Sequence, residues 1–290
     1  MPKITAVIIA YWPSRHPSIP LIVQELRSGS RVPDHIIVVN NNPRVPLAPI
    51  EGCSLLNAQH NYTSRAKYAA AMLEPSDYYM LLDDDIGADR DFIAHYESIA
   101  YPGCCLCDGG FILVDNFSTH GRFVGAWDVQ QNTRIDIFIG RMQFLSFQAI
   151  VNMFSIEAKI RIPNLPRYRS VGEDLLIALA NESYVVAIDP NRQYKGTPKP
   201  SFVGRMARDP GHLALRDEFC HRARLALGMS PFPGPVPGES KDDQIRTAIY
   251  LQLLKDRDEG KIPCEMEISE LNKYEKDHWA IFSSPAPTGS

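Results

Sequence analysis

Three consecutive aspartates, Asp83, Asp84 and Asp85, directly follow the apolar run Tyr78–Leu82. Adjacent carboxylates repel one another, so ionising all three together is unfavourable unless a cation is close by. A divalent cation such as Mn²⁺ or Mg²⁺ removes that repulsion and can hold a diphosphate at the same time. A solvated acidic turn, or a cap for a helix near Asp91, would explain the same residues. The position of the triplet at the end of an expected strand favours the metal–diphosphate interpretation.

The elements that must position this triplet alternate along the first hundred residues. Apolar runs predict strands at Ile4–Ala10, His35–Val39, Ser54–Leu56 and Tyr78–Leu82. Helical spacing predicts helices at Leu21–Arg27, Ser64–Leu73 and Asp91–Ala100. This alternation is typical of an α/β fold with a mostly parallel central sheet flanked by helices, in which ligands bind beyond the carboxyl ends of the strands.

Beyond residue 103 the pattern changes to short apolar runs separated by turns. These runs predict either an extension of the sheet or a small second, antiparallel sheet. The expected strands are Cys104–Cys107, Phe111–Val114, Phe123–Val129, Ile135–Ile139 and Tyr184–Ile188. The expected helices are Phe147–Phe154, Glu173–Ala180, His212–Leu227 and Asp242–Lys255, the last two giving a helical C-terminal region.

A second acidic pair, Glu173-Asp174, opens one of the expected helices. The helix N-terminus favours ionised carboxylates, and a carboxylate there can accept the proton of a hydroxyl group as a general base. Simple capping of the helix is the alternative explanation.

The segment Leu81–Ile86 resembles the Asp-x-Asp element of GT-A-fold (Rossmann-like) nucleotide-sugar glycosyltransferases. The pattern is nearest to the inverting Glu-Asp-motif branch and the exostosin-like branch. The resemblance implies that Asp85, together with Asp83, binds Mn²⁺ or Mg²⁺, and that Asp83 and Asp84 contact the donor. It also implies that Asp174 is the catalytic base, with Glu173 as its orienting partner. In a retaining enzyme, Asp174 would instead stabilise an oxocarbenium-like state.

Further positions match the same family in chain order. The resemblance implies a donor-binding role for Tyr11 and Asn41, which follow the first two strands, and for Arg65 before the metal strand, with Lys67 as the second choice there. It also implies that a histidine near the C-terminal end of the matching region, His212, binds the metal. Gly140 and Arg216 are the remaining residues for which it implies contact with the donor.

Composition places the chain among ordinary globular proteins. Its 290 residues carry a net charge of -4, which gives no global attraction to nucleic acid. The longest apolar runs are strand-sized, well short of the roughly 20 residues of a transmembrane helix. Because a strand begins at Ile4, we expect no signal peptide. We therefore expect a cytoplasmic protein whose six cysteines are reduced.

A proline-rich stretch, Ser230–Gly238, suggests where the catalytic region ends. We expect a catalytic domain over residues 1–228, made of a nucleotide-sugar half (1–102) and an acceptor half (103–228). A helical extension (229–282) and a disordered tail (283–290) are expected to follow.

The sequence thus predicts a metal-dependent, hexosyltransferase-like glycosyltransferase that moves a sugar from a nucleotide diphosphate sugar, in the first instance a UDP-sugar, to an acceptor hydroxyl. A glycan, a lipid or a small molecule is the expected acceptor. Three alternatives stay open: a glycosyltransferase acting on hydroxymethylated bases of phage DNA, a nucleotidyltransferase, and a non-catalytic nucleotide-sugar-binding module. A nucleotidyltransferase should carry a glycine-rich loop after the first strand, and Ala10–Pro20 contains no glycine.

Overall fold

The computed structural model describes residues 1–87, 90–112, 122–125, 129–138, 141–160, 162, 165–186, 209–229 and 238–283. They divide into two compact units. The first unit comprises the described residues within Met1–Val114, His120–Arg161 and Glu173–Val203, and the second those within Ile162–Gly172 and Gly204–Ser290. Two segments that the sequence analysis placed in the acceptor half, Ile162–Gly172 and the helix from His212, therefore group with the C-terminal helices. Most of the expected linker Ser230–Gly238 and the tail after Ser283 lie outside the described residues.

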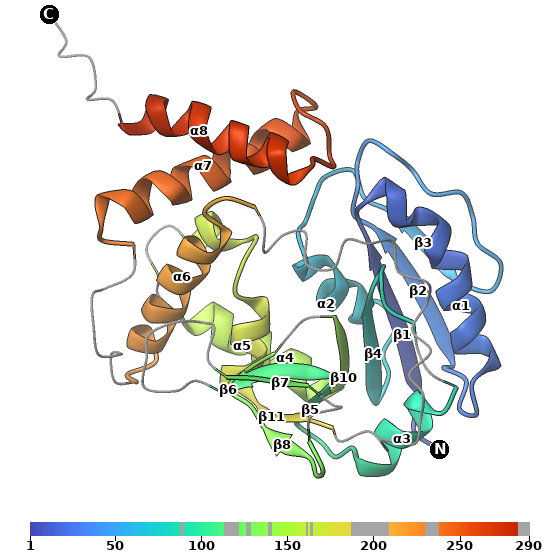
Figure 1. Ribbon diagram of the computed structural model, residues 1–290. Coiled ribbons are helices and arrows are strands. Elements are labelled where there is room, and N and C mark those ends of the chain that lie inside the picture. The colour runs from blue at the N-terminus through green and yellow to red at the C-terminus, as the bar shows by residue number, and fades with distance from the viewer. Residues whose placement is uncertain are drawn as a thin grey trace, which may run out of the picture. The chain divides into compact units, whose positions relative to one another are not determined.

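The first unit is built on an eight-stranded sheet with the order β3-β2-β1-β4-β10-β5-β11-β8 (Figure 1). Its strands are β1 (Ile4–Ala10), β2 (His35–Asn40), β3 (Ser54–Asn57), β4 (Tyr78–Asp83), β5 (Cys104–Cys107), β8 (Thr133–Arg134), β10 (Met142–Ser146) and β11 (Glu182–Val185). Only β10 and β8 run against the others. A small antiparallel sheet has the order β7-β6-β9, from Arg122–Gly125, Gly109–Ile112 and Ile137–Phe138. The expected α/β architecture is thereby confirmed.

The strand order reverses beside β1. Strands β2 and β3 follow on one side of β1, and the chain then returns to place β4 on its other side. Helix α1 (Ile19–Ser28) packs on the sheet face that carries Ile8 and Leu82. Helix α2 (Arg65–Ala71) packs on the opposite face. In open α/β sheets, the carboxyl ends of the strands at such a reversal are the usual ligand position.

Strand β10 was not predicted from the sequence. The run Met142–Phe154 is mostly apolar, and only its second part was recognised, as helix α4 (Phe147–Lys159). Ser146 separates the two elements: its side chain accepts the Ala149 amide, which caps the helix. Because β10 pairs with both β4 and β5, it joins the two halves of the sheet.

Other expected strands are shorter in the structure than in the sequence analysis. The run Phe123–Val129 was expected to be one strand, but β7 ends at Gly125, and residues 126–128 lie outside the described residues. In the first unit, η1 (Pro13–Ser18), α3 (Phe92–Ile99) and α5 (Glu173–Ala180) complete the elements that surround the sheet.

The second unit is helical. It contains η2 (Leu165–Tyr168), α6 (His212–Ala226), α7 (Lys241–Asp258) and α8 (Ile268–Ser283), the last lying in the expected helical extension without having been given bounds of its own. Its core brings together Ile245, Ile249, Leu253, Leu271 and Tyr274. Within the described part of the chain, every helix is too short or too polar to cross a membrane.

Candidate functional site

The acidic triplet lies at the carboxyl end of β4, beside the end of β1. Asp84 is the buried member, with 5% of its side chain exposed, and both of its carboxylate oxygens have partners. Its Oδ1 is 2.9 Å from Arg15 Nη1, and its Oδ2 accepts the Tyr11 amide at 3.1 Å. The same Arg15 nitrogen is 3.2 Å from Asp85 Oδ2. One buried guanidinium from η1 therefore fixes two of the three carboxylates.

Asp83 forms its ion pair with a different residue, a lysine. Lys67 Nζ, on α2, lies 3.1 Å from Asp83 Oδ1, and the lysine is almost fully buried. Desolvation raises the pKa of Asp83 to about 7; Lys67 opposes this rise, and the charges of Asp85 and Asp84 add to it. Burial likewise raises the pKa of Asp84, with Arg15 opposing. A third of the Asp83 side-chain surface is exposed, more than that of Asp84 or Asp85.

These contacts correct one premise of the sequence analysis. The triplet was expected to need a nearby divalent cation to offset its repulsion, but Arg15 and Lys67 already supply positive charge within the protein. Asp83 Oδ2 and Asp85 Oδ1 remain outside these ion pairs. Across the described residues, no group of three or more His, Cys, Asp or Glu side chains is arranged to hold a metal ion. A divalent cation would fit here only with one or two carboxylates and the phosphates of a substrate as its ligands, which is the set Mg²⁺ commonly takes.

The asparagines after β2 build the neighbouring loop. Asn41 is buried; its Nδ2 donates to Asn61 Oδ1 and Thr63 O, and its Oδ1 accepts the Tyr62 amide. Asn42 donates to the Tyr11 carbonyl. The polar atoms of Asn41, for which a donor-binding role was expected, therefore support the loop.

Two basic residues of α2 have different partners. Arg65, the first choice from the sequence, forms an ion pair with Glu157 of α4. Lys67, the second choice, reaches the triplet. Residues two positions apart point to different sides of a helix, so only one of the two can face Asp83.

The acidic pair Glu173-Asp174 forms the first turn of α5, as the sequence predicted. Asp174 is buried, and its Oδ1 accepts the Leu175 amide at 2.9 Å. Among the described residues, Glu173 Oε2 is buried and has no hydrogen-bond partner. An unsatisfied buried carboxylate oxygen is unfavourable unless a ligand completes it.

A buried tyrosine links the two acidic elements. Tyr68 OH donates to Gln143 Oε1 at 2.8 Å, in the interior between α2 and β10. Burial, followed by the charge of Glu173, raises the pKa of Tyr68 well above its usual value, and Asp174 and Asp83 add to the effect. Negative charges of the triplet and of the Glu173-Asp174 pair therefore both disfavour ionisation of the Tyr68 hydroxyl. Sequence reasoning missed Tyr68, Gln143 and Arg15.

The remaining sequence candidates are His212, Arg216, Gly140 and Tyr11. His212 and Arg216 are residues of α6 in the second unit, where His212 Nδ1 is 3.0 Å from Tyr250 OH. Gly140 lies outside the described residues. Tyr11 is partly exposed at the end of β1, with its ring edge-on to Trp12.

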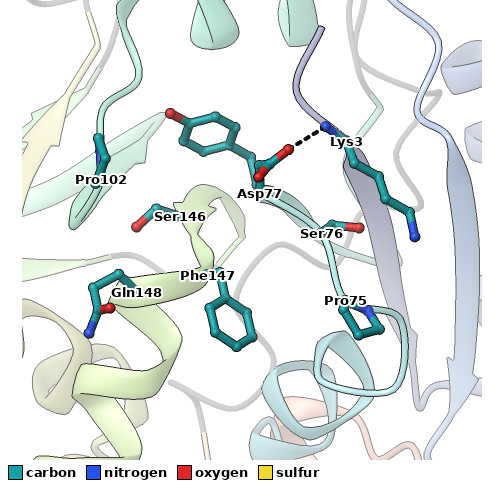
Figure 2. Close-up of a pocket in the computed structure, with 9 residues that line it drawn as sticks. Lys3, Pro75, Ser76, Asp77, Pro102, Ser146, Phe147 and Gln148 are labelled. Carbon is teal, nitrogen blue, oxygen red and sulfur yellow. Dashed lines mark hydrogen bonds between the residues drawn. The ribbon is translucent and has the colours of Figure 1, made fainter.

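A cavity of about 490 Å³ lies beside the start of β4 and the end of β10 (Figure 2). It is lined by Lys3, Pro75, Ser76, Asp77, Tyr78, Pro102, Ser146, Phe147 and Gln148. Tyr78 begins β4 and Asp83 ends it, so the length of the strand, roughly 17 Å, separates this cavity from the triplet. The cavity is therefore not part of the acidic site.

Comparisons with known proteins complete the description. No family model and no curated protein matches the chain. Among solved structures, one similar chain is described as a mannosyltransferase from Pyrobaculum calidifontis in complex with GDP-Man and Mn²⁺. The two chains are 13% identical, with a TM-score of 0.39; 97% of this chain and 86% of the other are covered.

Proposed function

We propose that the chain is a metal-dependent glycosyltransferase that uses a nucleotide diphosphate sugar. One observation carries the proposal. Asp83 and Asp85 each keep a carboxylate oxygen outside the internal ion pairs, at the strand ends where the sheet order reverses. The Glu173-Asp174 pair, in the same compact unit, supplies carboxylates for the acceptor side.

The chain's own residues divide the work of the reaction. Asp83 and Asp85 would hold a divalent cation, and the donor diphosphate would complete its ligand set. When bound, the cation offsets the charge that develops on the departing diphosphate. Lys67 and Arg15 keep the triplet in place, because each is buried against its carboxylate partner.

Asp174 is proposed as the base on the acceptor side. The acceptor oxygen forms a bond to the anomeric carbon, the bond from that carbon to the diphosphate oxygen breaks, and Asp174 takes the hydroxyl proton. If the configuration is retained, Asp174 would stabilise the oxocarbenium-like state instead. A UDP-sugar is the first donor to test, and a glycan, lipid or small molecule the acceptor.

The test is a donor screen with and without Mn²⁺. Release of UDP or GDP from a panel of nucleotide sugars is measured for the wild type, for Asp85→Ala and for Glu51→Ala, which removes an exposed carboxylate in a turn. We expect Mn²⁺-dependent release that Asp85→Ala abolishes and Glu51→Ala preserves. Full activity of Asp85→Ala would end the metal hypothesis. Donor binding without release by the wild type, even with an acceptor array, would indicate a binding module.

A further inference from the structure

Arg141 lies beside the acidic triplet, directly before the neighbouring strand β10. The amide of Asp83 donates to the Arg141 carbonyl at 2.8 Å. The register of β4 and β10 pairs Met142 with Leu82, one residue further along the pair, so Arg141 lies opposite Asp83. Opposite residues of an antiparallel pair point to the same face of a sheet, with their Cα atoms about 4.5–5.5 Å apart. The side chain of Arg141 therefore leaves the sheet on the same face as Asp83, where β4 ends.

Contacts from α2 identify this face of the sheet. Lys67 of α2 forms the ion pair with Asp83. Tyr68, the next residue of α2, donates to Gln143 of β10. Residues two positions apart on a strand point to the same face, so Arg141 and Gln143 both project toward the α2 side of the sheet. Arg141 and the Lys67–Asp83 pair therefore lie on one face, at one edge, of the first unit.

A buried carboxylate holds one part of the Arg141 guanidinium. Asp108 directly follows β5, and β5 runs parallel to β4 because both strands pair antiparallel with β10. The carboxyl ends of β4 and β5 therefore reach the same edge of the sheet. Asp108 Oδ2 lies 3.0 Å from Arg141 Nη2, and only 2% of the Asp108 side chain is exposed. An ion pair with a buried carboxylate restricts the orientation of the guanidinium.

The same guanidinium keeps donors that this ion pair does not use. An arginine side chain carries five N–H donors, and among the described residues that of Arg141 donates only through Nη2. Its Nε is buried and has no hydrogen-bond partner in that part of the chain, which is unfavourable. The side chain is 22% exposed, so a ligand can reach it from solvent. The planar fork of an arginine matches the oxygens of a phosphate group, and the unused donors suit such an anion.

The other cations beside the triplet are engaged with its carboxylates. Arg15 pairs with Asp84 and Asp85, and Lys67 pairs with Asp83. Arg141 differs because its carboxylate partner lies outside the triplet, on the next strand but one. A diphosphate bound at the end of β4 could therefore be contacted by the proposed divalent cation and, from β10, by Arg141.

We infer that Arg141 binds a phosphate group of the donor beside the triplet, through the N–H donors that its ion pair with Asp108 leaves unused. For the identity of the ligand as a nucleotide diphosphate, this role rests on the proposed function. The position of Arg141 opposite Asp83 and its ion pair with Asp108 stand on the contacts within the first unit alone.

The test measures nucleotide binding by the full chain, using calorimetric titration in saturating Mn²⁺ with uridine, UMP and UDP and with guanosine, GMP and GDP. Arg141→Lys keeps the charge but loses the planar fork. The double variant Arg141→Met/Asp108→Asn removes the arginine without leaving a buried carboxylate charged and unpaired. Arg134→Met is the matched control, because it removes an exposed arginine of the edge strand β8 in the same unit.

We expect the double variant to raise the Kd of the diphosphate that the wild type prefers by about 10- to 100-fold, because a charge-assisted hydrogen bond is lost. Arg141→Lys should raise it by about three- to tenfold. The Kd of the matching nucleoside, which carries no phosphate, should stay within about twofold of wild type in every variant, and Arg134→Met should resemble wild type throughout. Should the double variant fail to fold, Arg141→Lys carries the measurement.

A diphosphate Kd within about twofold of wild type in the folded Arg141 variants would overturn this role, and so would a loss of affinity that the nucleoside shares equally. An unchanged diphosphate Kd with a raised acceptor KM would overturn it as well, by assigning Arg141 to the acceptor. A wild type that binds UDP or GDP but releases neither from a nucleotide sugar would refute the proposed function, while the Kd values would still decide whether Arg141 binds phosphate.

Discussion

Replacing Arg15 by methionine should destabilise the first unit strongly. Arg15 Nη1 lies 2.9 Å from an Asp84 oxygen and 3.2 Å from an Asp85 oxygen, and these carboxylates are only 5% and 10% exposed. Methionine fills much of the same aliphatic volume but leaves both charges without their partner. Removing one member of a buried ion pair costs about 3–5 kcal/mol of unfolding free energy. At about 2–4 °C per kcal/mol for a unit of this size, the melting temperature should fall by roughly 6–20 °C.

The double variant Arg15→Met/Asp84→Asn separates charge from packing. The neutral amide can still accept the Tyr11 amide, and only Asp85 is then left uncompensated. We expect the double variant to be more stable than Arg15→Met alone by at least about 1 kcal/mol. Urea unfolding at pH 7, followed by far-ultraviolet circular dichroism, measures both. A loss below about 0.5 kcal/mol in Arg15→Met, or no recovery in the double variant, would refute the view that Arg15 neutralises the triplet.

Two further predictions concern Asp174 and Gly172. Asp174→Asn should lower transfer by about 10²–10⁴-fold while the Kd for the nucleotide stays unchanged, as measured by single-turnover kinetics and calorimetric titration; unchanged transfer would remove it as the base. Gly172→Ala should destabilise the protein by at least about 2 kcal/mol more than Gly228→Ala in thermal unfolding. Both glycines have positive φ, but a Cβ at Gly172 meets Phe219 whereas one at Gly228 meets nothing within 4 Å, so equal losses would contradict the clash.

The sequence predicted β1, β2 and β4 well because these strands are almost entirely buried. All of β1 is buried, so the run Ile4–Ala10 stands out as apolar without interruption. The end of β4 at Asp83 was also predictable, because the sequence changes there from apolar to acidic residues as the strand leaves the core. Strand β10 was missed because no glycine or proline separates it from α4, and an apolar run alone does not distinguish strand from helix.

The candidate site was only partly predictable. The triplet and the Glu173-Asp174 pair are local patterns and were found directly. Arg15 is 69 residues from Asp84, and nothing in its spacing indicates the ion pair. Choosing between Arg65 and Lys67 requires the rotation of α2 about its axis, which the packing of the helix on the sheet decides.

The central place of β10 has a consequence for how the chain folds during synthesis. β10 covers the edge of β4, pairing Met142 with Leu82 across a separation of 60 residues. Until residue 146 has left the ribosome, the strand that carries the triplet presents open hydrogen-bonding groups that invite pairing with other chains. Long-range pairing of this kind also slows folding. A fragment that stops at residue 102 should therefore aggregate, and residues 1–102 should stay soluble only in a chain that includes β10.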